Sequence, residues 1–233
     1  MTETIREIAF DTETTGLDPL NGDRVIEVGG VELINHIPTG KNFRMLINPG
    51  RQVSEATVRI TGLTDDILAD KPQFEDPSVV DALVDFIGDA QIVAHNAGFD
   101  RGFLNMELER CGRPIYPDER WVDTLMIAKK RFPGAPASLD ALCRRFDVSL
   151  ESRTLHGALL DAQLLATVYL ELLGGRARAF EFASDGSTGG SETRTPARQR
   201  PKPLAPLASE DEIALHRAFV TSLGETAIWR RYG

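Results

Sequence analysis

The sequence contains too few cysteines to build a disulfide framework. Its two cysteines, Cys111 and Cys143, form no CxxC pair, which is typical of a reducing cytoplasm and predicts two small core residues. No apolar stretch approaches the length needed to span a bilayer, and the first residues, MTETIREIAF, lack a secretory signal. We therefore expect a soluble, cytoplasmic protein with no membrane association.

The sequence also lacks the basic excess of proteins that coat DNA. The formal net charge is -9; the acidic excess is confined to residues 1–175, and residues 176–233 are slightly basic. Because non-specific DNA binding depends on neutralising phosphates, this charge argues against a free-standing DNA-coating protein. An acidic body can still act on nucleic acid if its carboxylates hold cations that meet the phosphates, although solubility alone also explains the charge.

Apolar segments separated by turn signals predict a mixed α/β domain. Runs of β-branched residues at 5–10 and 25–34 flank the turn-rich segment TTGLDPLNGD, which predicts a hairpin. Further strands are expected at 42–47, 91–94 and around Val122, and helices at 77–88, 103–110, 123–131, 139–146 and 159–173. Asp123 or Thr124 can cap the third of these helices, and Ser138 the fourth. This order of elements favours a mixed sheet flanked by helices.

The composition changes after residue 175. Residues 183–203 are rich in Ser, Thr, Gly and Pro and contain no large apolar side chain, which predicts a flexible linker. Ser209 and Glu212 form a capping-box pattern ahead of a short helix. Such a helix is marginal alone, so we expect Phe219, Leu223 and Trp229 to dock onto a partner. The expected organisation is a domain at 1–180, a linker at 181–205 and a docking segment at 206–233.

Acidic residues stand at the ends of the expected elements. Asp11 and Glu13 end the first strand, and the strand period of two places both carboxylates on one side, although such a pair alone is more typical of solvated turn acids. Asp100 at a helix start could be a cap, and Asp161 near a helix start could simply favour the helix dipole. His156 precedes Asp161 by five residues, which favours a position on the entering loop.

Three blocks in order give these residues a joint meaning. DTETTGL and HNAGFD each follow a strand, and HGALLDA enters a helix; together they resemble the DEDDh, or DnaQ-like, exonuclease superfamily. The stretches RFPGAPASLDALCRRF and RTLHGALLDAQLLATVYLELLGG are similar to the family of epsilon, or proofreading, subunits of bacterial DNA polymerase III. The resemblance covers about residues 5–175 and implies a ribonuclease H-like fold, a mixed five-stranded sheet with flanking helices.

The resemblance also implies a reaction, the 3′→5′ removal of nucleoside 5′-monophosphates from a single-stranded or mispaired DNA end. By position in the blocks, Asp11, Glu13, Asp100 and Asp161 look like ligands of two Mg²⁺ or Mn²⁺ ions, and His156 looks like the general base. Hard divalent cations prefer oxygen ligands, and two ions can activate a water and stabilise the leaving oxygen. An imidazole can take the proton of that water near neutral pH.

Other residues of the blocks resemble contacts to the substrate strand. These are Thr12, Thr15, Leu17, Asn96 and Phe99. Grip on single strands through backbone contacts and base stacking tolerates any sequence, which suits an exonuclease. The alternative for Leu17 and Phe99 is a place in the hydrophobic core.

The resemblance suggests partners as well. IWRR, at residues 228–231, resembles the end of the segment with which epsilon subunits dock onto the polymerase alpha subunit. A theta-like subunit is a further candidate partner. A sliding-clamp contact is doubtful because RARAFEF, at residues 176–182, lacks the usual leading Gln. Two alternatives stay open, an exoribonuclease of the same superfamily and a non-catalytic subunit that stabilises a polymerase.

Overall fold

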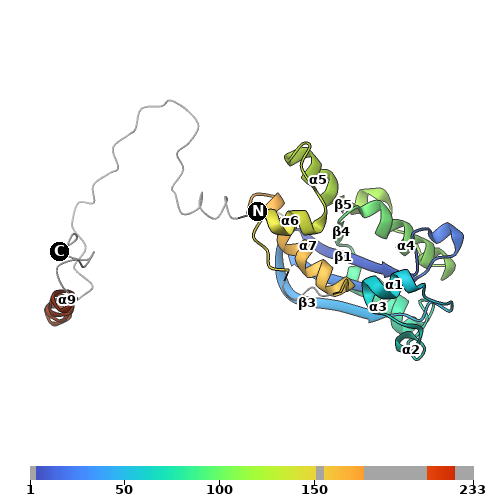
Figure 1. Ribbon diagram of the computed structural model, residues 1–233, viewed down its shortest axis with the longest axis horizontal. Helices are drawn as coiled ribbons and strands as arrows, with labels where there is room; N and C mark the ends of the chain where they lie inside the picture. Colours follow the sequence, from blue (N-terminus) through green and yellow to red (C-terminus); the bar gives the residue numbers. More distant parts are fainter. Residues whose placement is uncertain (1–3, 151–154, 176–208, 224–233) are drawn as a thin grey trace. The chain divides into compact units, whose positions relative to one another are not determined.

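The computed structural model describes residues 4–150, 155–175 and 209–223 (Figure 1). The chain divides into two compact units, Met1–Gly186 and Ser187–Gly233. Trp229 and the expected linker and clamp segments lie outside the described residues. Within the described ranges, no helix is both long and apolar enough to cross a lipid bilayer.

The first unit is built on a mixed five-stranded sheet. Its strands are β1 (Arg6–Thr14), β2 (Val25–Ile34), β3 (Ile37–Leu46), β4 (Gln91–Ala94) and β5 (Trp121–Asp123), in the order β3-β2-β1-β4-β5. β1, β2 and β3 pair antiparallel, whereas β4 pairs parallel with both β1 and β5. The predicted fold class is confirmed.

Seven α-helices of the first unit surround this sheet in the described residues. They are α1 (Glu55–Thr61), α2 (Asp65–Leu68), α3 (Pro77–Ile87), α4 (Ala97–Arg110), α5 (Thr124–Arg131), α6 (Leu139–Arg145) and α7 (Ala158–Leu172), with 3₁₀ turns at Pro19–Asn21 and Asp118–Arg120. Asp123 caps α5 by accepting a hydrogen bond from the Leu125 N–H at 2.9 Å. Ser138 caps α6 in the same way. Of the two caps considered for α5, the structure therefore has Asp123.

Some element boundaries differ from the sequence prediction, and two helices were not predicted. β3 begins at Ile37 because Asn35 and His36, both with positive φ, close a tight turn directly after β2. α4 begins at Ala97, six residues earlier than expected, because Asn96 takes a left-handed φ of 69° and turns the chain straight from β4 into the helix. α1 and α2 were not predicted, although Ser54 and Gly62 are ordinary cap residues for α1.

The helices cover both faces of the sheet (Figure 1). Ile8 and Phe10 of β1 pack in a cluster that includes residues of α3 and α4. Ala9, which points the other way, packs against α7. Cys143 is fully buried and Cys111 packs at the edge of the core; neither forms a disulfide bond. The alternation along β1 therefore assigns one face to α3 and α4 and the other to α7.

The start of α7 lies directly against the backbone of β2 at Gly29. A Cβ added to Gly29 would lie 2.1 Å from the carbonyl carbon and 2.2 Å from the carbonyl oxygen of Ala158, the first residue of α7. No side-chain rotation can relieve a collision with backbone atoms. The absence of a side chain at Gly29 thus allows α7 to approach the sheet at this end.

We expect Gly29→Ala to lower the free energy of unfolding by ~3 kcal/mol, since overpacking forces the backbone to move. The matched control is Gly98→Ala in α4, where an added Cβ meets no atom within 4 Å and alanine favours the helix. Thermal and urea unfolding of both variants measure the difference. Equal stabilities would show that α7 does not press on Gly29.

Candidate active site

Asp11 and Glu13 project from the end of β1 toward α7. Both continue the face that carries Ala9, which packs against α7. Gly29, the partner of Asp11 across the β1–β2 ladder, also faces the start of α7. Both acids are half-buried. The prediction that their carboxylates share one side of the strand is confirmed.

Glu13 lies close to one residue of the loop before α7 and to one residue of the first turn of α7. One ligand atom each from Glu13, His156 and Asp161 lie within 4.8 Å of one another. His156 Nδ1 is 3.3 Å from Asp161 Oδ2. The His156 side chain is 49% exposed and that of Asp161 is 6% exposed. A half-exposed imidazole therefore lies next to a buried carboxylate.

His156 lies on the loop before α7, as predicted, because the helix begins at Ala158 and Gly157 is its N-cap. The backbone N–H of His156 donates a hydrogen bond to the Ile60 carbonyl of α1 at 3.0 Å. Asp161 lies in the first turn of α7. The positive end of the helix dipole stabilises its negative charge there.

Asp100 joins the site through the strand residue between the two β1 acids. Its Oδ1 accepts hydrogen bonds from the Thr12 N–H at 2.9 Å and from the Thr12 hydroxyl at 2.8 Å. Burial raises the pKa of Asp100 to about 7, with a further contribution from the Asp123 charge, while the Thr12 hydrogen bonds oppose the rise. Asp100 does not cap α4, because Asn96 holds that position.

The carboxylate oxygens of this site are suitable ligands for divalent cations. Carboxylate oxygens are the ligands that Mg²⁺ and Mn²⁺ prefer. Burying a carboxylate is costly without a compensating positive charge, and both Asp100 and Asp161 are buried. Asp11 and Asp100 are not members of the tight group of Glu13, His156 and Asp161. The candidate ligands therefore come from three elements: two acids lie at the end of β1, one lies on α4 and one lies on α7.

An apolar pocket of about 360 Å³ adjoins Glu13. β1 and the segment after it contribute Thr12, Glu13 and Leu17, α4 contributes Phe99, and α1 contributes Ala56, Thr57, Ile60 and Thr61. Leu17 is 84% exposed, so its alternative place in the core is wrong. Phe99 packs at the core edge, with its ring centroid 4.9 Å from that of Phe103. The α1 residues of this pocket were not predicted, because no helix was expected at Glu55–Thr61.

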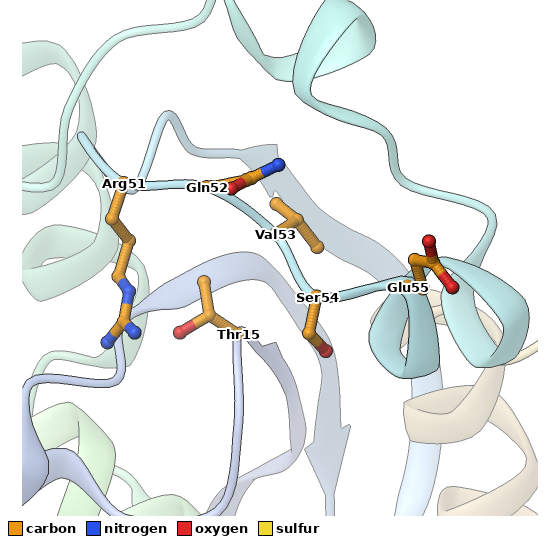
Figure 2. A pocket seen from close by; sticks show the side chains of 6 residues that line it. All are labelled: Thr15, Arg51, Gln52, Val53, Ser54 and Glu55. Carbon is orange, nitrogen blue, oxygen red and sulfur yellow. The ribbon is translucent and has the colours of Figure 1, made fainter.

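A second, polar pocket of about 550 Å³ lies beside the first and contains Thr15. Figure 2 shows Thr15 and the segment from Arg51 to Glu55 around it. Ser54 lines both pockets. Arg51 donates a hydrogen bond to Asp23 Oδ1 at 3.1 Å, and Thr15 donates to the same oxygen at 3.0 Å. Thr15 thus lies in the neighbouring pocket, and Asn96 lines neither of the two.

The second unit contributes one described helix, α9 (Glu210–Ser222). Its predicted capping box between Ser209 and Glu212 is confirmed. Phe219 is 61% exposed and Leu223 is 46% exposed, which leaves the docking role of these two residues and of Trp229 a prediction.

Known proteins resemble this chain over most of its length. Residues 8–169 match the model of the RNase_T exonuclease family. The chain is 40% identical over 230 residues to DNA polymerase III subunit epsilon of Rickettsia felis, covering 96% of this chain and 99% of the relative. It is also 40% identical over 239 residues to DNA polymerase III subunit epsilon of Escherichia coli K12, covering 97% of each.

Solved nuclease structures share the fold. Exonuclease X in complex with 5′ overhanging duplex DNA is 27% identical, with a TM-score of 0.56 over 74% of this chain and 93% of that one. The nuclease domain of 3′hExo, a DEDDh family member bound to rAMP, is 21% identical, with a TM-score of 0.60 over 73% and 92% of the two chains. The chain therefore belongs to the family of DNA polymerase III epsilon subunits, whose RNase_T exonuclease domain uses divalent metal ions.

Proposed function

We propose that this exonuclease removes nucleoside 5′-monophosphates from the 3′ end of single-stranded or mispaired DNA, as the proofreading subunit of a replicative polymerase. The observation that carries the proposal is the meeting of Glu13, His156 and Asp161 within 4.8 Å, beside an apolar pocket that Glu13 also lines. A hydrolytic group of residues next to a space for one base is what removal of terminal nucleotides requires.

The acids and the histidine divide the chemistry. Asp11, Glu13, Asp100 and Asp161 would hold two Mg²⁺ or Mn²⁺ ions, which would activate a water and stabilise the leaving 3′-oxygen. His156 accepts the proton of the attacking water as general base. Asp161 Oδ2, 3.3 Å from His156 Nδ1, orients the imidazole. Thr12 holds Asp100 against β1 through two hydrogen bonds.

The pocket residues hold the end of the strand. Leu17 and Phe99 offer apolar surfaces on which a terminal base can stack, a contact that does not depend on base identity. Thr12 and Thr15, which line the two pockets, and Asn96, which lies outside both, are the proposed contacts to the rest of the terminal nucleotide. The exposure of Leu17, 84%, supports this role because it leaves a large apolar side chain available to a base.

The partners follow from the relatives. Their name, DNA polymerase III subunit epsilon, supports association with the polymerase in the cytoplasm. We propose that the alpha subunit binds the C-terminal segment through Phe219, Leu223 and Trp229. The exposure of Phe219 and Leu223 supports this docking. A theta-like subunit is a further candidate partner. The sliding clamp is a weaker candidate than the theta-like subunit.

Digestion of 5′-labelled single-stranded DNA and RNA of matched sequence tests the activity. With Mg²⁺ or Mn²⁺, we expect the purified protein to shorten DNA from its 3′ end much faster than RNA. A chelator should stop the reaction, and added metal should restore it, because the carboxylates act through bound cations.

Other outcomes of this experiment lead to the alternatives. Faster shortening of RNA would make the protein an exoribonuclease of the same superfamily. Absence of metal-dependent hydrolysis on either strand would favour the non-catalytic subunit that stabilises a polymerase. The products, separated by chromatography, should be nucleoside 5′-monophosphates.

A further inference from the structure

Glu27 of β2 is a buried carboxylate at the junction of the sheet and α7. Its side chain is 2% exposed. Oε1 accepts a hydrogen bond from Arg44 Nε of β3 at 2.6 Å, and Oε2 accepts one from the Ala158 N–H at 3.3 Å. Glu27 therefore connects two strands to the first residue of α7.

Glu27 takes the place of the missing cap of α7. The N-cap residue of that helix is Gly157, which has no side chain with which to cap it. The first N–H groups of a helix have no partner within the helix. A carboxylate at this end accepts a hydrogen bond from one of them and interacts favourably with the positive end of the helix dipole. Glu27 supplies that carboxylate from a strand far away in the sequence.

The same residue adjoins the strand that carries the β1 acids. Glu27 is the partner of Glu13 across the β1–β2 ladder. Its contact with Ala158 fixes the start of the helix that carries Asp161, directly after the loop of His156. One side chain thus links the strand next to Glu13 to the start of the helix that carries Asp161 and follows the His156 loop.

Both oxygens of Glu27 have hydrogen-bond partners within the protein. Arg44 occupies one and the α7 backbone occupies the other. Glu27 is also outside the group of Glu13, His156 and Asp161. These contacts favour a role in positioning over a role as a further metal ligand.

We propose that Glu27 is a positioning residue of the exonuclease site, which holds His156 and Asp161 at the distance from Glu13 that metal binding and proton transfer require. The proposal rests on the proposed function of that site. Residues that orient metal ligands through hydrogen bonds affect metal affinity or turnover by roughly 10-fold to 100-fold when they are replaced.

Glu7 provides a matched control on the same sheet and helix. It is also buried, with a side chain 1% exposed, and it accepts a hydrogen bond from the Tyr169 hydroxyl of α7 at 2.7 Å. Glu7 lies at the opposite end of β1 from Asp11 and Glu13 and pairs there with Leu33 of β2. Replacing Glu7 removes a buried carboxylate from the same layer without touching the start of α7.

The test compares Glu27→Ala and Glu27→Gln with Glu7→Ala and Glu7→Gln in the full chain. Mn²⁺ binding is followed by titration with electron paramagnetic resonance, and kcat and KM are measured on single-stranded DNA at saturating metal. Thermal unfolding is recorded for each variant. Mn²⁺ binding reports on the site even if the protein hydrolyses nothing, so failure of the proposed function is distinguishable from failure of this inference.

We expect Glu27→Ala to weaken Mn²⁺ binding or lower kcat by roughly 10-fold to 100-fold, with KM unchanged. Glu27→Gln should recover most of this loss, because its amide oxygen can still accept the Ala158 N–H and the half-exposed Arg44 side chain can turn to solvent. The Glu7 variants should lose stability but keep Mn²⁺ binding and kcat.

Two results would overturn the proposal. One is a Glu27→Ala protein that binds Mn²⁺ and turns over like the Glu7→Ala protein. The other is a folded Glu27→Gln protein with Mn²⁺ binding and kcat as impaired as those of Glu27→Ala, since the hydrogen bond to α7 would then not be what matters. If Glu27→Ala does not fold, Glu27→Leu takes its place, because leucine fills a similar volume without a hydrogen-bond acceptor for the Ala158 N–H. It is compared with Glu7→Leu in the same readouts, and equal Mn²⁺ binding and kcat in the two proteins would overturn the proposal.

Discussion

Replacing both Asp11 and Glu13 by alanine should reduce hydrolysis of single-stranded DNA by more than about 10⁴-fold, beyond the loss expected from removing a general base alone. The two carboxylates share one side of β1, and Glu13 lies with His156 and Asp161. Without Asp11 and Glu13, the proposed cations lose the ligands that β1 provides. Since both side chains are half-buried at the end of the sheet, the fold should persist.

The measurement is single-turnover digestion of 5′-labelled DNA with Mg²⁺, together with thermal unfolding. A double variant with Asp66→Ala and Glu109→Ala is the control, because it removes the same charge from exposed positions outside the site. It should keep full activity. Retained hydrolysis in the Asp11 and Glu13 double variant would show that the metal ligands have been assigned wrongly.

His156→Ala should lower kcat by roughly 10²-fold to 10⁴-fold, the contribution of a positioned general base. The side chain is 49% exposed, so little packing is lost and stability should change little. KM for DNA should stay the same because the proposed strand contacts lie on other residues.

Steady-state kinetics across the pH range and Mn²⁺ titration check the role of His156. Mn²⁺ binding should persist in the variant if His156 is a base rather than a ligand. His216→Ala, an exposed histidine of α9, serves as the control and should match the wild type. A His156→Ala protein with wild-type kcat would assign proton removal to another group.

Much of this architecture follows from local sequence. Asp123 and Ser138 cap α5 and α6 as predicted because capping depends on residues only two or three positions apart. The face shared by Asp11 and Glu13 follows from the period of a strand. Where the backbone conformation was unusual, prediction failed: Asn96 with its left-handed φ moved the start of α4 to Ala97.

By itself, the sequence determined the nuclease family and the mixed sheet, and it supplied the acids and the histidine that we propose as the site. The tertiary structure decided how they meet. Thr12 holds Asp100, α1 lines the apolar pocket beside Glu13, and Glu27 reaches Ala158 across 131 residues of chain. These contacts join residues remote in sequence, and their geometry depends on how helices pack on the sheet, which neither local propensity nor residue spacing encodes.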